Sequence, residues 1–297
     1  METGVDLAGP EGRAGREGRM KYFTSSDGLK LAYFDEGSGM PMVCLPGLSR
    51  NSEDFEPVAA AFSDRARIIR LDLRGRGESE YDKNFSNYNV MVEARDVVEL
   101  LDHLGLDRAV VFGTSRGGLI ALALAGTERG RLSGIIFNDI GPHIDPTGMA
   151  RIVRTLGILP PEETLEPYIR RFAAESAEQF PGVTYEHWRT YVSRTLQETP
   201  DGLEYRYDTK IRDAVLASLE AGNWPDLWPL LDQCEGLPLL LLKGENSDIL
   251  SYETAEEMHR RRPDMDYVIV KDRGHIPFLD EPEAQAAIGK YIEALKN

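Results

Sequence analysis

The sequence predicts an α/β protein with a mostly parallel, doubly wound sheet and an inserted helical lid. Short apolar runs alternate with helical segments along most of the chain, and this alternation is typical of parallel strands covered by helices on both faces. One apolar run leads directly into a G-x-S-x-G turn at residues 113–117. The alternation stops over residues 143–230, which we interpret as the lid. The α/β core is then expected to consist of residues 20–142 and 231–297.

The composition limits the classes of partner. The chain has 297 residues, of which 41% are apolar, and this is enough for one large core. Its formal net charge of −16 argues against binding to nucleic acid or to an anionic membrane surface, because both attract basic faces. No apolar stretch approaches the ~20 residues that a membrane span needs. The charge indicates little else, since an acidic surface mostly favours solubility, and the choice between monomer and homodimer stays open.

The N-terminal segment and the cysteines bear on where the protein works. Residues 1–19 contain five glycines, one proline and many charges without an apolar run, which predicts a disordered extension rather than a secretory signal. Whether translation starts at Met1 or at Met20 stays open. The two cysteines, Cys44 and Cys234, have neither metal-ligand spacing nor the density of a disulfide scaffold. Together these features fit a cytoplasmic protein.

The elements expected before the G-x-S-x-G turn begin with a hairpin. Two runs of strand-forming residues, at 22–24 and 29–34, flank the turn sequence Ser-Asp-Gly. A long segment at 90–104 carries its apolar residues at helical spacing, so it predicts a helix with one buried face. The other elements expected in this half are strands at 42–45 and 68–72 and a helix at 55–62.

The G-x-S-x-G turn lies between a predicted strand at 109–112 and a predicted helix at 119–125. A further apolar strand is expected at 134–138, just before the lid. The lid itself is rich in charged and aromatic residues and lacks strong strand signals, so it is expected to be helical. The remaining core elements are expected to be strands at 237–242 and 267–270 and a closing helix at 283–295.

Ser115 is the candidate nucleophile. A strand before it and a helix after it force the serine onto a sharp corner, where its hydroxyl points outward. Gly113 and Gly117 flank the corner because a side chain at either position would collide with the neighbouring strand or helix. A bare G-x-S-x-G is a weak signal, but in this strand–turn–helix context it predicts a nucleophile elbow.

His275 is the candidate general base. A serine hydroxyl is a poor nucleophile at neutral pH and needs a base within hydrogen-bond reach. His275 follows the predicted strand at 267–270 in a loop at the C-terminal edge of the sheet, where open α/β sheets place their sites. Among the other histidines, His143 is a candidate substrate contact because it follows the strand at 134–138 and can face the cleft.

A carboxylate is needed to hold the imidazole in one tautomer and to balance its transient positive charge. Asp248, in the loop after the predicted strand at 237–242, is the first candidate for this acid. Asp139 is the alternative, because it comes directly after the strand at 134–138 and a carboxylate there can also reach the histidine.

Two backbone N–H groups are candidates for an oxyanion hole, which stabilises the charge on the tetrahedral intermediate. One is the N–H of Arg116, the residue after the nucleophile, and the other is the N–H of Leu48 in the loop after the strand at 42–45. The Arg116 side chain has two alternative roles. It either binds a substrate carboxylate or forms a salt bridge to the lid.

These residues resemble the α/β-hydrolase superfamily over about residues 20–295. Besides the elbow, residues 71–79 read Leu-Asp-Leu-Arg-Gly-Arg-Gly-Glu-Ser and resemble the superfamily's D-x-R-G-x-G-x-S loop. Residues 273–275 and 280–283 resemble its histidine loop and the start of its last helix. One departure is Pro46 before Gly47, where the family often has a histidine. The resemblance implies the α/β-hydrolase fold, with the helical insertion as the lid.

The resemblance implies a serine hydrolase without a cofactor or metal, and no metal-binding motif stands in the sequence. Ser115, Asp248 and His275 occur in the family's order of nucleophile, acid and histidine. The expected reaction is hydrolysis of carboxylic esters of small to medium, partly apolar substrates through an acyl-enzyme. The same triad also serves a lactonase, thioesterase, aminopeptidase or C–C bond hydrolase. A non-catalytic ligand-binding protein of this fold is the remaining alternative, whereas the serine argues against the haloalkane dehalogenase branch, whose nucleophile is a carboxylate.

Overall fold

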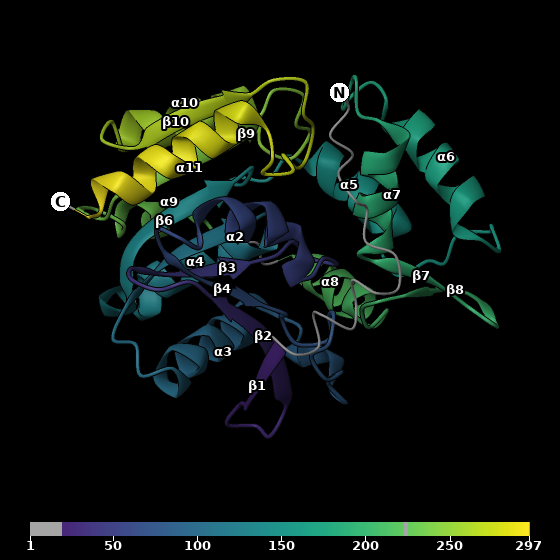
Figure 1. Ribbon diagram of the computed structural model, residues 1–297, viewed down its shortest axis with the longest axis horizontal. Coiled ribbons are helices and arrows are strands. Elements are labelled where there is room, and N and C mark those ends of the chain that lie inside the picture. Colours follow the sequence, from purple (N-terminus) through teal and green to yellow (C-terminus); the bar gives the residue numbers. More distant parts are fainter. Residues whose placement is uncertain (1–19, 223–224, 297) are drawn as a thin grey trace.

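A central sheet organises the chain. The computed structural model describes residues 20–222 and 225–296, so the extension expected over 1–19 lies outside the described residues. The sheet has eight strands in the order β1-β2-β4-β3-β5-β6-β9-β10 (Figure 1). The strands are β1 (Met20–Thr24), β2 (Lys30–Glu36), β3 (Pro41–Leu45), β4 (Arg67–Leu71), β5 (Ala109–Thr114), β6 (Leu132–Asn138), β9 (Leu239–Gly244) and β10 (Asp266–Val270).

The pairing of the strands agrees with the predicted fold class. β1 and β2 form the predicted antiparallel hairpin, with Met20 opposite Phe34, and β2 also runs antiparallel to β4. All other neighbouring strands in this sheet are parallel. Since parallel strands all end at the same edge, the loops after β3, β5, β6, β9 and β10 gather there.

Helices cover both faces of the sheet, as expected for a doubly wound fold. Alternate residues of each central strand pack on opposite faces, so that Val111 belongs to one apolar cluster and Phe112 to the other. The first face is covered by α3 (Val90–His103), α4 (Arg116–Thr127) and α10 (Tyr252–Arg261), and the second by α2 (Glu56–Phe62) and α11 (Pro282–Ala294). Cys44 and Cys234 are buried, free thiols within these two clusters.

The segment between β6 and β9 forms a separate group beside the C-terminal edge of the sheet (Figure 1). Its side chains make an aromatic cluster of their own, around Trp188, which includes Phe278 from the loop that carries His275. The segment is therefore packed directly onto that loop. Its elements are α5 (Pro146–Thr155), α6 (Leu165–Ser176), α7 (Tyr185–Ser193), β7 (Leu196–Thr199), β8 (Gly202–Tyr205) and α8 (Ile211–Glu220).

Two details of this segment differ from the sequence-based expectation. β7 and β8 form an antiparallel hairpin where only helices were expected. Its signal is the Asp201-Gly202 pair, in which Gly202 adopts a φ of +113° that other residues rarely adopt. In addition, α9 (Trp228–Asp232) packs on α4 of the core, because Leu230 lies against Gly126. The predicted boundary at residue 230 therefore cuts through a core helix.

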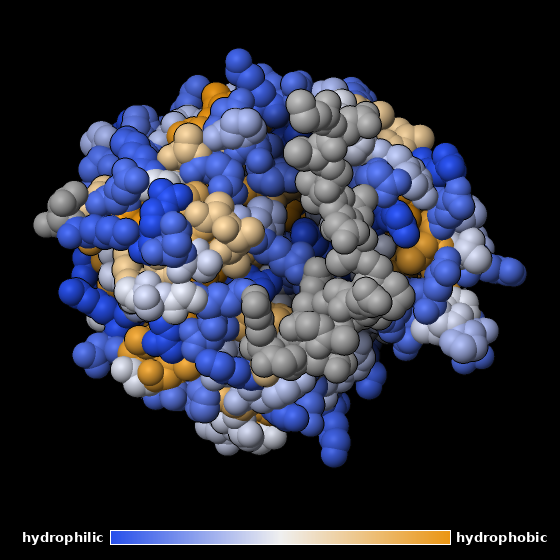
Figure 2. Space-filling view, in the orientation of Figure 1, coloured by the Kyte–Doolittle hydropathy of each residue, from blue (hydrophilic) through white to orange (hydrophobic). Residues whose placement is uncertain are grey.

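Figure 2 shows a face that consists mostly of hydrophilic residues, with the hydrophobic ones in small, separate patches. Within residues 20–222 and 225–296, no helix is both long and apolar enough to cross a membrane.

Candidate active site

Ser115 occupies the sharp corner between β5 and α4. Its φ of +49° lies in the left-handed region, which non-glycine residues rarely adopt and which is typical of functional strain. A Cβ on Gly113 would lie 2.3 Å from the backbone of Gly117, and a Cβ on Gly117 would lie 2.2 Å from the carbonyl oxygen of Leu45. Both flanking glycines are thus required by close backbone contacts, as the sequence analysis predicted.

Ser115, His275 and Asp139 form a continuous chain of hydrogen bonds. The Nε2 of His275 lies 2.9 Å from the Oγ of Ser115, and its Nδ1 lies 2.7 Å from Oδ2 of Asp139. The Asp139 side chain is fully buried and the His275 side chain is 7% exposed. The spacing fits a neutral imidazole that accepts the serine proton at Nε2 while its Nδ1–H donates to the carboxylate.

The carboxylate of Asp139 is held by donors from the neighbouring strand. Its Oδ1 accepts a hydrogen bond from the N–H of Gly244 at 2.8 Å, and Oδ2 also accepts one from the hydroxyl of Ser247 at 2.5 Å. Asp139 follows β6 directly and has a φ of +55°. These donors compensate for the burial of the carboxylate and fix its direction toward His275.

Asp248, the acid first expected from the sequence, does not contact His275 by a hydrogen bond. Its carboxylate accepts two hydrogen bonds from Arg151 of α5, at 2.6 Å from Nε and 2.9 Å from Nη2. From the same loop, Ser247 donates its hydroxyl hydrogen to Asp139, the carboxylate that binds His275. The prediction of Asp248 is therefore corrected to its alternative, Asp139, because Arg151 from the lid engages the Asp248 carboxylate.

The pKa values of the Arg151–Asp248 pair reflect this contact. Burial acts to raise the pKa of the Asp248 carboxyl, but the hydrogen bonds and charge of Arg151 outweigh it, so the pKa lies below its usual value. The same hydrogen bonds raise the pKa of Arg151. Both groups are therefore charged at neutral pH.

The two expected oxyanion donors belong to segments that adjoin Ser115. A Cβ on Gly47 would lie 3.9 Å from Cβ of Ser115, so the loop that carries Leu48 is adjacent to the nucleophile. Arg116 is the first residue of α4, and N–H groups in the first turn of a helix have no carbonyl partner within it. The structure thus places the segments that carry both N–H groups beside Ser115, and their role as an oxyanion hole stays a prediction.

A buried network of charges lies behind these two residues. Arg76 donates from Nε to the carbonyl oxygen of Leu48 at 2.9 Å and from Nη1 to Glu93 at 2.7 Å. The other carboxylate oxygen of Glu93 accepts a hydrogen bond from Nε of Arg116 at 2.6 Å. Arg76 and Glu93 are fully buried. Burial acts to raise the pKa of Glu93, but the two arginines outweigh it and lower that pKa below 4.5.

This network decides the two roles considered for the Arg116 side chain. The guanidinium is bound to Glu93 of α3 and donates to the carbonyl oxygen of Tyr88, and Arg116 is not among the residues that line the cavity. It forms a salt bridge, but to the core rather than to the lid. His143 is exposed and does not line the cavity either. The structure therefore supports neither side chain as a substrate contact.

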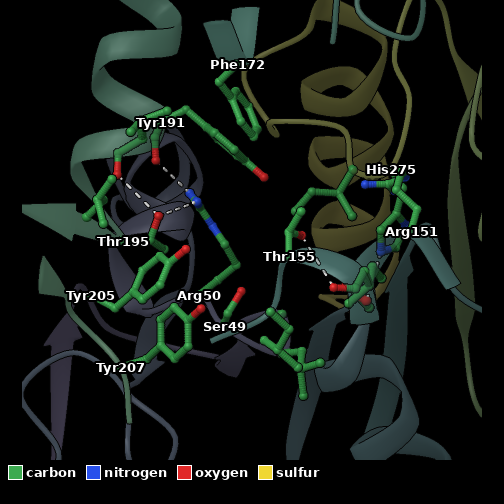
Figure 3. A pocket seen from close by; sticks show the side chains of 18 of the residues that line it. Ser49, Arg50, Arg151, Thr155, Phe172, Tyr191, Thr195, Tyr205, Tyr207 and His275 are labelled. Carbon is green, nitrogen blue, oxygen red and sulfur yellow. Dashed lines mark hydrogen bonds between the residues drawn. The ribbon is translucent and has the colours of Figure 1, made fainter. Parts of the chain in front are cut away.

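A cavity of about 190 Å³ opens onto Ser115 and His275. It lies between the core loops and the lid, and the described residues that line it include two arginines and no Asp or Glu. In Figure 3, Arg151 and His275 lie on one side of the cavity and Arg50, Tyr205 and Tyr207 on the other. The remaining lining side chains are mainly aromatic, aliphatic or hydroxyl-bearing, among them Tyr168, Phe172, Tyr191, Leu156, Ser49 and Thr195.

No cluster of three or more His, Cys, Asp or Glu residues suited to a metal ion occurs in the described parts of the chain.

The topology of the sheet and the aligned Ser–His–Asp hydrogen bonds define the class of α/β hydrolases. A family model described as alpha/beta hydrolase fold matches residues 40–282, and the chain belongs to this family.

Several similar proteins are named as hydrolases. The chain is 34% identical to 3-hydroxybutyrate-oligomer hydrolase from Cupriavidus necator over 270 residues, which cover 87% of this chain and 91% of the relative. It is 26% identical to 2-(acetamidomethylene)succinate hydrolase from Mesorhizobium japonicum over 271 residues, which cover 90% and 92%. A crystal structure of an α/β hydrolase from Novosphingobium aromaticivorans has 38% identity and a TM-score of 0.86, with 92% of this chain and 97% of that chain covered. The chain is accordingly a hydrolase of this family.

Proposed function

We propose that the protein is a serine hydrolase that cleaves carboxylic esters through an acyl-enzyme. The observation that carries this proposal is the hydrogen-bond chain from Ser115 through His275 to Asp139, which opens onto the cavity. A nucleophile, its base and an orienting carboxylate are the three parts that nucleophilic catalysis by serine needs.

The reaction has two steps. In the first, His275 removes the proton of Ser115, the serine oxygen attacks the acyl carbon, and the tetrahedral intermediate expels the alcohol, which receives that proton from His275. In the second, His275 takes a proton from water, and the resulting hydroxide attacks the acyl-enzyme. The acid then leaves as Ser115 recovers its proton. Asp139 balances the charge of the imidazolium in both steps.

The oxyanion that forms in each step lies next to the N–H groups of Leu48 and Arg116. Each such donor typically contributes about 2.7–4 kcal/mol to stabilising the transition state. The hydrogen bond from Arg76 to the carbonyl oxygen of Leu48 supports this role, because it holds the peptide groups of that loop in a fixed orientation.

The cavity favours a small, partly apolar ester. Its aromatic and aliphatic walls suit apolar groups, and its volume of about 190 Å³ suits a short substrate. The relative from Cupriavidus necator is named for hydrolysing 3-hydroxybutyrate oligomers, and the units of such an oligomer are joined by ester bonds. This name supports an ester of a short hydroxy acid as the substrate.

The test is hydrolysis of p-nitrophenyl acyl esters of increasing chain length by wild type, Ser115→Ala and the control Ser86→Ala. Ser86 is an exposed serine remote in sequence from the elbow. We expect turnover that favours short acyl chains, loss of turnover in Ser115→Ala and no change in Ser86→Ala. A fluorophosphonate probe should label Ser115 in the wild type, as read by mass spectrometry.

Absence of both turnover and labelling in folded wild type would contradict the serine-hydrolase mechanism. Labelling of Ser115 with turnover of γ-butyrolactone or of a thioester, but not of open-chain oxygen esters, would keep the mechanism and replace the substrate class.

A further inference from the structure

We propose that Arg151 is a carboxylate-binding subsite, which makes the enzyme selective for esters of hydroxy acids whose own carboxyl group is free. This inference rests on the proposed ester hydrolase and names the substrate class. In such a substrate the carboxylate belongs to the alcohol part, the part released first.

The charge of the cavity wall is the first argument. The whole chain has 50 acidic and 34 basic residues, yet the described residues that line the cavity include Arg50 and Arg151 and no acid. The charged side chains among these lining residues are therefore both cationic. A carboxylate on the substrate would complement them, whereas a neutral ester would not.

The donors of Arg50 are already occupied. Its Nε and Nη2 bind Asp54 at 2.6 and 2.5 Å, and its other contacts are the hydroxyl of Thr195 and the carbonyl oxygen of Tyr191. The guanidinium also lies over the Tyr191 ring, 3.7 Å from its centroid. Arg50 therefore holds the lid onto the core and has little capacity left for a ligand.

Arg151 has a donor edge that remains open. Its Nε and Nη2 bind Asp248, while its Nη1 has no hydrogen-bond partner within the described residues. The side chain is 41% exposed and lines the cavity. The guanidinium can therefore donate from Nη1, and from the second hydrogen of Nη2, to a ligand carboxylate.

Arg74 in the same molecule shows that an arginine whose Nε and Nη2 donate to one carboxylate can bind a second carboxylate through Nη1. Its Nε and Nη2 bind Asp96 at 2.6 and 2.7 Å, and its Nη1 binds Asp82 at 2.6 Å. In the Arg151–Asp248 pair, Nε and Nη2 bind one carboxylate in the same way, and Nη1 is left for a ligand in the cavity. Asp248 thus acts as a positioning residue, which fixes the plane of the Arg151 guanidinium.

The position of Arg151 relative to His275 decides which part of the ester bears the carboxylate. His275 protonates the leaving alcohol, so the alcohol part lies on the histidine side of Ser115 in the proposed reaction. Arg151 lies on that same side of the cavity (Figure 3). A carboxylate attached to the alcohol part is therefore on the same side of the cavity as the Arg151 guanidinium, and the acyl part is directed toward the side where Tyr205 and Tyr207 lie.

The experiment compares 3-acetoxybutanoate with 3-acetoxybutanamide, in which an uncharged carboxamide of similar size replaces the carboxylate of the alcohol part. Acetate release is measured for wild type, Arg151→Gln, Arg151→Lys and the control Arg154→Gln. Arg154 is exposed on the same helix, so its replacement removes an equal charge outside the cavity.

We expect wild type to favour the acid over the amide in kcat/KM. Arg151→Gln should lower this ratio about tenfold or more, mainly through KM of the acid, because a charge-assisted pair of hydrogen bonds is lost. Arg151→Lys should recover only part of the ratio, since lysine cannot bind two oxygens side by side. Hydrolysis of the amide by Arg151→Gln should fall much less than that of the acid, because the amide oxygen accepts only a neutral hydrogen bond from Arg151. A cooperative urea unfolding transition shows separately that the variant is folded.

An unchanged ratio in Arg151→Gln, or an equal loss in Arg154→Gln, would overturn the inference while leaving the ester hydrolase intact. Calorimetric titration of 3-acetoxybutanoate into Ser115→Ala, with and without Arg151→Gln, measures the binding affinity without any turnover. If wild type hydrolyses neither compound, the p-nitrophenyl ester assay and the labelling of Ser115 decide the proposed function, and weaker binding to the double variant than to Ser115→Ala still decides whether Arg151 is the carboxylate subsite.

Discussion

The two sides of the active site hold their charges in different ways. On the core side, Glu93 lies between Arg76 and Arg116 with no exposed side-chain surface. On the lid side, Arg151 and Asp248 pair with 41% and 20% of their side chains exposed. The core network connects the two residues that carry the expected oxyanion donors, whereas the lid pair leaves one donor edge toward the cavity.

The difference in burial predicts that the ion pairs on the core side are costly to disrupt and that the pair on the lid side is not. Removing one member of a buried ion pair leaves an uncompensated charge and typically costs about 3–5 kcal/mol. A solvent-exposed pair typically contributes only about 0.2–1 kcal/mol. The core network is thus costly to rearrange, and the lid pair is the part that, in the substrate class proposed above, exchanges water for a ligand.

The largest expected effect separates the two aspartates. Asp139→Asn should lower kcat on a p-nitrophenyl ester by about 10⁴-fold, because an amide can hold the wrong tautomer of His275 and cannot balance its charge. Asp248→Asn should change kcat on the same ester less than tenfold, since its carboxylate contacts Arg151 and not the histidine. Steady-state kinetics of the two purified variants measure this directly. Equal losses in both would mean that Asp248 takes the catalytic position during turnover.

The next effect concerns stability on the core side. Glu93→Gln should lower the free energy of unfolding by about 3–5 kcal/mol, because Arg76 and Arg116 lose the charge that compensates their burial. Arg151→Gln, on the lid side, should lower it by about 1 kcal/mol or less. Urea unfolding followed by tryptophan fluorescence gives both values. Similar losses for the two variants would remove the distinction between the two sides.

The pH dependence of stability sharpens the same comparison. The pKa of Glu93 in the folded protein lies below its usual 4.5, so ionised Glu93 contributes stability above about pH 4.5, and this contribution falls as pH drops through the folded-state pKa. The difference in Tm between wild type and Glu93→Gln should therefore be constant from pH 8 to about pH 5 and shrink below pH 4.5. Scanning calorimetry across this range checks the sign. A difference that grows on acidification would contradict the assignment.

The smallest expected effect is that of Asp248→Asn on folding. The pair is partly exposed, so its loss should change the free energy of unfolding by about 1 kcal/mol or less. The same urea titration measures it beside Glu93→Gln. A loss of several kcal/mol would show that the Arg151–Asp248 pair is a major attachment of the lid rather than an adjustable part of the site.

Local patterns in the sequence were enough to predict the core elements and two of the three residues in the hydrogen-bond chain. Ser115 is identified by the strand before it, the helix after it and the glycines beside it, all within a few residues. His275 is identified by its place in a loop after a predicted strand. The short Asp201-Gly202 turn in the lid was missed, although the pair is a hairpin signal of the same local kind.

Local sequence patterns do not identify which carboxylate binds His275. Asp139 and Asp248 both follow strands that lie side by side in the sheet, so periodicity places both near His275. The tertiary structure decided between them, because Gly244 and Ser247 direct Asp139 toward the histidine while Arg151 draws Asp248 to the lid. The sequence by itself determined the strand–turn–helix elements, since these depend on neighbouring residues and backbone geometry. The partner of each charge was decided only by folding, because an ion pair forms between whichever groups the folded chain brings into contact.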